Sequence, residues 1–213
     1  MLITYRKDGL ILENPKGEVF VIDPRPQIFF DPKFAKYEKT STIHFIFSGR
    51  SPIENFSLKR AQLQDWNIRL YFEKKFASEV FGAKITSPLS THLKEFERLS
   101  FSFTDMILYP SKKSKLFGLI QQSCPYQFEV INGQPFFLLS SPHLSEELLV
   151  EIHQKKYPLL CWLHDLRDLR AYNDLISKVD NQGKILEINQ SLALDGKDKW
   201  ARPKERENQA LSM

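Results

Sequence analysis

The sequence predicts an α/β protein in which two β-sheets are sandwiched between helices, a four-layer αββα arrangement. The first forty residues contain short apolar segments typical of strands, and residues 43–81 then alternate between strand and helix patterns. Residues 99–139 return to strand patterns, and residues 145–188 alternate again. Two strand-rich stretches, each followed by an alternating stretch, are expected to form two sheets with helices on their outer faces.

The first half of the chain supplies the first predicted sheet. Asn14-Pro-Lys-Gly17 separates two apolar segments, and these residue types favour a tight turn. Ile43–Phe47 is a nearly continuous apolar run, as expected of a central strand covered on both faces. Ser51 and Glu54 have the spacing of a capping box, which predicts a helix to about Trp66. The remaining elements predicted here are a strand over 68–71 and a helix over 73–81, ended by Gly82.

The second half supplies the second predicted sheet. Leu99, Phe101 and Phe103 alternate with small polar residues, which predicts a half-buried strand over 99–104. Asn132-Gly133 predicts a hairpin with a type I′ turn, since both residues accept a positive φ. Ser145-Glu-Glu, with lysines one helix length later, predicts a helix aligned with its macrodipole. The other elements predicted are strands over 116–121, 126–131, 134–139, 159–163 and 184–188 and a helix over 168–179.

Length and composition are those of one folded unit. We expect a single domain over residues 1–194 and a charged tail over 195–213 that is poor in apolar residues and therefore disordered. The formal net charge of +4 permits an anionic partner without requiring one. Cys124 and Cys161 lack metal-ligand spacing and are expected to be buried thiols. The sequence shows no signal pattern and no membrane-length apolar run, so we expect a soluble, cytoplasmic protein.

The N-terminal strands close on Ile22-Asp23-Pro24, and this motif, with the order of strands and helices, resembles the metallo-β-lactamase superfamily. The resemblance covers residues 1–190 and is to the compact branch related to L-ascorbate-6-phosphate lactonase. It implies the four-layer αββα fold. In that superfamily a His-x-His-x-Asp-His loop holds two metal ions, which lower the pKa of a bridging water.

The metal ligands of the superfamily are missing from this chain. The positions of the ligand loop fall on Gly49, Ser51, Ile53 and Glu54. The side chains of glycine and isoleucine cannot bind a metal ion. The two further ligand positions fall on Ser111–Lys113 and Ser140–His143. The resemblance therefore implies a degenerate active site, that is, a hydrolase-like pseudoenzyme for which no cofactor is expected.

The residues at these positions favour an anion site in place of the metals. The candidate anion-binding residues are Arg50, Ser51, Lys112, Lys113 and His143. The two lysines and the arginine supply positive charge, and the predicted helix start at Ser51 adds a partial positive charge. The alternative is that 111–115 is a solvated turn and that Ser51 serves only as a helix cap.

Three functions remain open from the sequence. The leading hypothesis is a non-catalytic protein that binds an anionic small molecule or a protein partner. The second is a phosphoester or lactone hydrolase with a relocated zinc or manganese site on Glu54, His143 and His164. The third is a nucleic-acid-binding accessory protein, although the mixed charges of the tail do not make it a basic arm. The resemblance further predicts that residues 48–51, 111–113, 141–143 and His164 converge on one rim of the sandwich.

Overall fold

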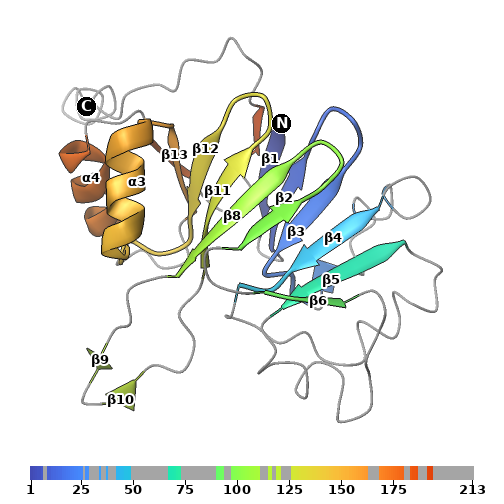
Figure 1. Ribbon diagram of the computed structural model, residues 1–213, viewed down its shortest axis with the longest axis horizontal. Helices are drawn as coiled ribbons and strands as arrows, with labels where there is room; N and C mark the ends of the chain where they lie inside the picture. Colours follow the sequence, from blue (N-terminus) through green and yellow to red (C-terminus); the bar gives the residue numbers. More distant parts are fainter. Residues whose placement is uncertain are drawn as a thin grey trace, which may run out of the picture.

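Two β-sheets face each other across a shared core, and two helices cover the far side of one of them (Figure 1). The computed structural model describes residues 1–6, 9–25, 27–28, 34, 37, 42–48, 67–72, 90–93, 97–110, 115–116, 119–120, 126–162, 168–179, 183–186 and 191–193. No helix within these ranges is long and apolar enough to cross a membrane.

Within the described residues the first sheet has seven strands, in the order β15-β1-β2-β3-β4-β5-β6. They are β1 (Leu2–Arg6), β2 (Gly9–Glu13), β3 (Val19–Ile22), β4 (Ile43–Ile46), β5 (Ile68–Phe72), β6 (Ser90–His92) and β15 (Ser191–Ala193). Neighbours from β15 to β3 pair antiparallel, whereas β3, β4, β5 and β6 run parallel. The carboxyl ends of these four parallel strands therefore lie at one edge of the sheet.

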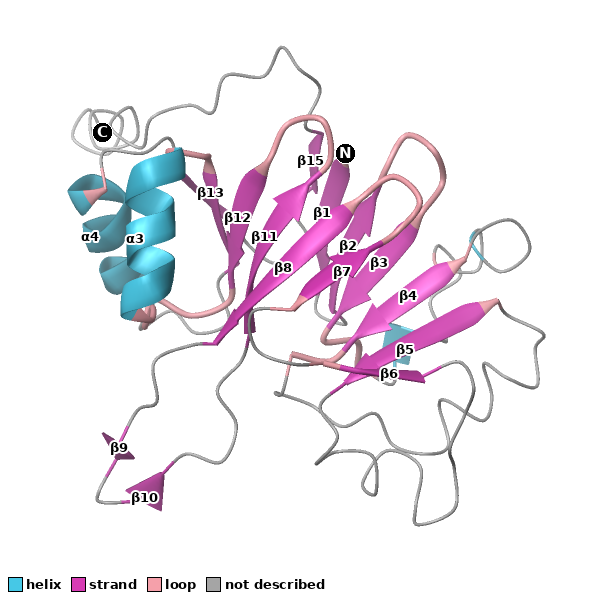
Figure 2. Cartoon of the chain, in the orientation of Figure 1, coloured by secondary structure: helices cyan, strands magenta, loops and turns pink. Residues whose placement is uncertain are grey.

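The second sheet has six strands in the described part of the chain, in the order β14-β13-β12-β11-β8-β7 (Figure 2). They are β7 (Arg98–Ser100), β8 (Asp105–Pro110), β11 (Tyr126–Ile131), β12 (Phe136–Leu139), β13 (Leu159–Trp162) and β14 (Gly183–Leu186). β11 is antiparallel to both β8 and β12, and β13 is parallel to β12. The end of β8, the start of β11 and the ends of β12 and β13 consequently share an edge. A separate ribbon joins β9 (Lys115–Leu116) and β10 (Leu119–Ile120).

The core between the sheets follows from the period-two alternation of strand side chains. Phe20 and Ile22 of β3 face Phe128 and Leu138 of the second sheet, and all four side chains are fully buried. Residues one position away on β3, such as Val21, point to the outer face instead. β3 and β4 therefore carry two apolar faces, which explains their continuous buried runs.

Two helices cover the outer face of the second sheet, α3 (Glu146–Lys155) and α4 (Asp168–Lys178). The side chain of Ser145 caps α3 by accepting the N–H of Leu148, and the helix begins where the sequence predicted. Ile152 of α3 and Tyr172 of α4 are fully buried against the sheet. These helices form one of the two predicted outer layers.

The outer face of the first sheet is also buried. Phe45 of β4 is fully buried there, in a cluster that includes Ile28, Phe34 and Tyr37. The helices predicted over 51–66 and 73–81 lie outside the described residues, as does the tail over 195–213. Two facing sheets are thus confirmed, while the helical fourth layer and the domain boundary at residue 194 remain predictions.

The strand predicted over 99–104 is wrong, because the chain turns within it. β7 ends at Ser100, the N–H of Phe101 donates to the carbonyl of Thr104 at 2.9 Å, and Phe103 is 54% exposed. The carboxylate of Glu18 accepts the backbone N–H groups of Ser102 (2.9 Å) and Phe103 (3.3 Å). The buried carboxylate of Glu18, from a neighbouring turn, therefore stabilises the turn at 101–104. The alternation of apolar and polar residues in the sequence does not indicate this turn.

The hairpin at Asn132-Gly133 is confirmed, but its type I′ turn is wrong. Only Gly133 has a positive φ, +66°, and the N–H of Gln134 donates to the carbonyl of Asn132 at 2.7 Å. β12 begins at Phe136 and not at residue 134. Proline has no N–H to donate to a strand ladder, so Pro135 lengthens the loop.

Side-chain amides join this hairpin to two other turns. The amide of Asn132 donates to Thr104 Oγ1 at 2.7 Å, and the amide of Asn14 donates to the same oxygen at 3.2 Å. Asn14 also donates to the carboxylate of Glu18 at 2.6 Å. We call Asn14, Glu18, Thr104 and Asn132 the three-turn network. It joins the β2–β3, β7–β8 and β11–β12 turns.

Gly183 provides a packing test of the α4 interface. A Cβ atom built at this position would lie 2.7–2.9 Å from the side-chain carbons of Ile176. We expect Gly183→Ala to lower the free energy of unfolding by about 1–3 kcal/mol, because the added methyl group overpacks the interface. Urea denaturation measures the loss, and adding Ile176→Val should recover part of it. Equal stability of Gly183→Ala and the parent chain would contradict this packing.

Candidate functional site

Polar residues follow the parallel strands of the first sheet at the edge where these strands end. Asp23 follows β3, and Ser48 lies two residues beyond β4. The backbone N–H of Asp23 donates to the carbonyl of Ile46 at 2.9 Å, which holds the two strand ends together. In parallel α/β sheets, ligands bind at this end of the strands.

Asp23 and Ser48 are hydrogen-bonded to each other at this edge, and both are buried. The carboxylate of Asp23 accepts the backbone N–H of Ser48 at 2.6 Å and its hydroxyl at 2.5 Å. The φ of Asp23 is +47°, a left-handed conformation that aspartate tolerates better than most residues. The pair therefore fixes the direction in which the chain leaves β4.

The backbone of Tyr126 connects this edge to the second sheet. Its N–H donates to the carbonyl of Ser48 at 3.1 Å, and its carbonyl accepts the hydroxyl of Ser140 at 3.3 Å. Tyr126 also pairs with Pro110, the last residue of β8. Ser48, Pro110 and Ser140 are distant in the sequence, but all three contact or pair with Tyr126. The segments that follow them therefore start at the same place in the fold.

Buried polar groups form hydrogen bonds with the start of the loop after β12. The side-chain amide oxygen of Gln127 accepts the N–H of Ser140 at 2.6 Å. Tyr172 of α4 places its hydroxyl within hydrogen-bonding distance of the carbonyls of Leu139 (3.3 Å) and Trp162 (3.4 Å). The ends of β12 and β13 are therefore adjacent. The exposed His143 lies three residues after Ser140, whose backbone is fixed by these contacts.

His143 is the only candidate site residue within the described ranges, and it is exposed at this edge. The other candidates, Arg50, Ser51, Glu54, Lys112, Lys113 and His164, lie outside those ranges. The described ends of their segments (Ser48, Pro110, Ser140 and Trp162) meet at one edge, which agrees with the predicted convergence. The assignments of the individual residues remain predictions.

The described side chains at this edge do not fit a two-metal centre. Such a centre needs several imidazoles and carboxylates around each ion. Among the described residues, no group of three or more His, Cys, Asp or Glu side chains is placed to hold a metal ion. The Asp23 carboxylate accepts two hydrogen bonds from Ser48, and Gln127 supports a backbone N–H. These groups organise the edge of the fold.

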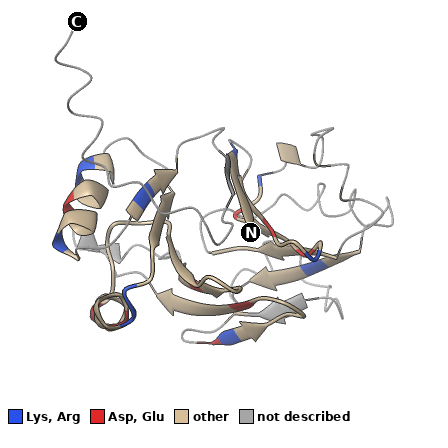
Figure 3. Cartoon of the chain, turned by 90° about the horizontal axis from the view of Figure 1, so that it is seen from above, with Lys and Arg blue, Asp and Glu red and all other residues tan. Residues whose placement is uncertain are grey.

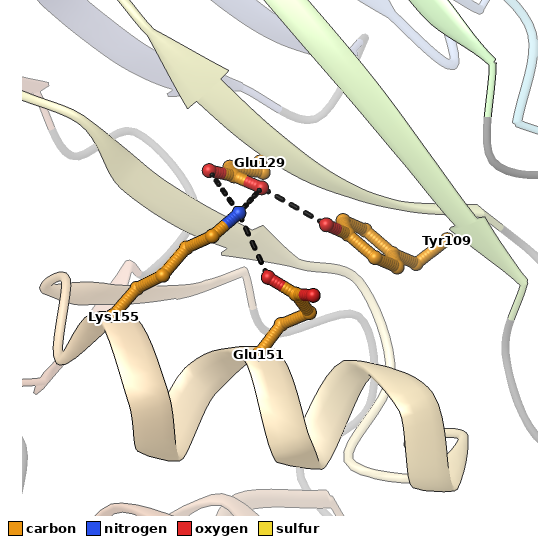
Figure 4. Close-up of polar contacts among 4 residues, drawn as sticks. All are labelled: Tyr109, Glu129, Glu151 and Lys155. Atoms are coloured by element: carbon orange, nitrogen blue, oxygen red, sulfur yellow. Dashed lines mark hydrogen bonds and ion pairs between the residues drawn. The ribbon is translucent and has the colours of Figure 1, made fainter.

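A partly buried ion-pair network lies between the second sheet and α3 (Figure 4). Glu129, 1% exposed, accepts from Lys155 Nζ at 2.7 and 2.9 Å and from the Tyr109 hydroxyl at 2.9 Å. Burial alone would lower the pKa of Lys155, but its hydrogen bonds to Glu129 and Glu151 raise it. Burial and the hydrogen bond to Glu129 raise the pKa of Tyr109.

This network was not predicted from the sequence, although one signal was present. Glu129 is the only charged residue in the strand Tyr126–Ile131. A charge in a strand that is otherwise covered on both faces requires a partner. Its partner Lys155 lies 26 residues away and is identified only by the fold.

His44 of β4 is buried among aromatic rings on the inner face of the first sheet. Its ring stacks on Phe20 with centroids 5.0 Å apart, and Phe101 packs edge-on at 4.7 Å. Nδ1 lies 3.1 Å from the hydroxyl of Tyr71. Burial, and secondarily the positive charge of Arg69, lower the pKa of His44 to about 4. The imidazole is therefore neutral at physiological pH.

The helical face of the molecule carries charges of both signs (Figure 3). α4 exposes Arg170, Asp174 and Lys178, and the exposed first turn of α3 contains Glu146 and Glu147. Charges interspersed in this way do not create a field of one sign. Arg170 and Lys178 therefore serve as control positions for tests of anion binding.

Comparisons with known proteins identify the fold. No family model matches the chain, and no curated protein matches its sequence. Among solved structures, the metallo-β-lactamase fold protein YhfI from Bacillus subtilis aligns with a TM-score of 0.55 and 7% identity, covering 90% of this chain and 98% of YhfI. A CmlA β-hydroxylase E377D mutant aligns with a TM-score of 0.57 and 11% identity over 91% of this chain. The chain spans 54% of that hydroxylase chain. These similarities show that the chain has the metallo-β-lactamase fold.

Proposed function

We propose that this chain is a non-catalytic protein of the metallo-β-lactamase fold that binds an anionic small molecule at the strand-end edge without a metal ion. The arrangement around Tyr126 carries the proposal, because it gathers the chain segments that begin at Ser48, Pro110 and Ser140. In this fold the same edge is the one on which the resemblance places the metals.

Chain connectivity supports an edge that is lined by basic residues. Arg50 follows Ser48 by two residues, and Lys112 follows Pro110 by two residues. Two residues span at most about 7 Å, so we expect both backbones to stay within reach of the edge around Tyr126. Together with Lys113 they supply guanidinium and ammonium groups, which bind phosphate and carboxylate groups by charge-assisted hydrogen bonds.

Two finer assignments complete the proposal. Gly49 and Ile53 support a degenerate site, and Asp23-Pro24 with the order of strands supports a relative of the L-ascorbate-6-phosphate lactonase-like branch. The helices predicted over 51–66 and 73–81 would cover the buried outer face of the first sheet and complete the αββα sandwich. A helix beginning at Ser51 would direct its N–H groups towards the bound anion.

Anion binding is tested by thermal unfolding with pyrophosphate or citrate in the presence of a chelator. A ligand that binds only the folded chain raises the unfolding temperature by mass action. We expect both a concentration-dependent rise and its weakening by added salt, since salt screens exposed charges. Isothermal titration with the better anion then gives the affinity.

The variant Arg50→Ala/Lys112→Ala should lose this stabilisation, whereas Arg170→Ala/Lys178→Ala, which removes the same number of charges, should keep it. The control removes basic residues from the mixed-charge surface of α4, so it separates a local site from a general effect of net charge. Equal responses of the two variants would contradict the proposed site. No response of the parent chain to either anion would contradict anion binding itself and would favour a protein partner.

A further inference from the structure

We propose that Asn132-Gly133 is a site of spontaneous covalent modification, at which deamidation of Asn132 releases the three-turn network. Asn132 is the only asparagine in the chain that is followed by glycine. Glycine has no side chain to hinder the approach of its backbone nitrogen to the preceding side-chain amide. The sequence thus concentrates this chemistry at one position.

The hairpin exposes this position to the water that the reaction consumes. Gly133 is exposed, and a Cβ atom built on it would meet nothing within 4 Å. Its φ of +66° and the hydrogen bond from the Gln134 N–H to the Asn132 carbonyl form a tight turn around it. The side chain of Asn132, by contrast, is half-buried and points back to the neighbouring turn.

The reaction needs only water. The backbone nitrogen of Gly133 attacks Cγ of Asn132, and the side-chain nitrogen leaves as ammonia with the proton of the Gly133 N–H. Water then adds to either carbonyl of the five-membered imide and returns a proton to the ring nitrogen. The product is aspartate or isoaspartate, and each carries a negative charge that the amide lacked.

Conversion of Asn132 to aspartate or isoaspartate would remove hydrogen bonds that join two turns. Asn132 Nδ2 donates to the carbonyl of Phe103 at 2.9 Å and to Thr104 Oγ1 at 2.7 Å. A carboxylate cannot donate either hydrogen bond at neutral pH. It would also bring a second negative charge to the network that already holds Glu18. An isoaspartate further adds a methylene group to the backbone beside the Val130–Phe136 pair.

Loosening of the 101–104 turn is expected to reach the core. Phe101 belongs to this turn and packs edge-on against both Phe20 and His44 at 4.7 Å. Loss of the Asn132 hydrogen bonds is therefore expected to loosen the packing of Phe101 on Phe20 and His44. The two hydrogen bonds also restrain the reacting amide, so removal of one acceptor should accelerate its modification.

The modification is tested by incubating the full chain at mildly alkaline pH and then cleaving it after Glu129 and Glu146. We expect fragment 130–146 to gain one mass unit over time and to become a substrate of an isoaspartyl methyltransferase. Thr104→Val removes an acceptor while keeping the side-chain shape, and it should speed the gain several-fold. A folded chain whose fragment keeps its mass would overturn the proposal.

The structural consequence is tested separately with Asn132→Asp, a direct copy of one product. Asn173→Asp on the exposed surface of α4 adds the same charge and is the matched control. We expect Asn132→Asp to lower the unfolding temperature by about 5 °C relative to this control. Proteolysis should also become faster within residues 101–104. Indistinguishable behaviour of the two variants would overturn the release of the network.

Discussion

Replacement of Lys155 by methionine is expected to lower the free energy of unfolding by about 3 kcal/mol, because it leaves the buried Glu129 without its ion-pair partner. Tyr109 still donates one hydrogen bond to that carboxylate, so the charge is not wholly uncompensated. Lys155 is 30% exposed, which places the expected loss at the lower end for a broken buried ion pair. Urea denaturation at neutral pH measures it.

The double variant Glu129→Gln/Lys155→Met is the control for this prediction. Removal of both charges eliminates the buried unpaired carboxylate, and buried ion pairs are often replaced without loss of stability. The double variant should therefore be more stable than Lys155→Met, with a coupling energy of about 1 kcal/mol or more. Strict additivity of the two single changes would show that the network does not hold α3 on the sheet.

Acid is expected to destabilise the folded chain through His44. The pKa of His44 is lowered from 6.5 to about 4 by burial and by Arg69. The unfolded chain binds the proton on His44 more tightly than the folded chain does, so protonation favours unfolding. The stability that depends on a neutral His44 is therefore complete above pH 6.5. It is lost as the pH falls from 6.5 towards 4. The full loss is on the order of 3 kcal/mol, at 1.36 kcal/mol for each pKa unit.

The measurement compares free energies of unfolding between pH 4 and pH 7 for the parent chain and for His44→Phe. Phenylalanine can still stack on Phe20 but cannot be protonated, so the variant should lack this part of the pH dependence. His153→Gln, at an exposed position on α3, should keep the parental slope. Parallel pH profiles for His44→Phe and the parent would contradict a buried neutral imidazole.

Two elements governed by local residue chemistry, the turn after β2 and the ends of α3, were predicted correctly. In the turn after β2, the Asn14 side chain accepts the N–H groups of Lys16 and Glu18, and Gly17 takes a φ of +84°. At α3, the helix start after Ser145 and the charges at both helix ends agree with the prediction. These features depend on contacts within a few residues, so the sequence pattern contains them.

Features governed by long-range contacts were mispredicted or missed. The alternation over 99–104 is that of a strand, but Glu18, more than eighty residues away, stabilises a turn there. The three-residue strands β6 and β15 are too short to show a period. The convergence around Tyr126 was expected only through the resemblance, because no local pattern records which strand ends meet.

The metal content of the purified chain tests the central claim most directly. The protein would be expressed in medium supplemented with zinc and manganese and measured before and after mild chelation, alongside His143→Ala and His164→Ala. We expect far less than one metal ion per chain in every sample, because the resemblance places Gly49 and Ile53 at positions where the superfamily has metal ligands. Stoichiometric, chelation-sensitive metal that is lost in either histidine variant would contradict this account and support a hydrolase with a relocated site.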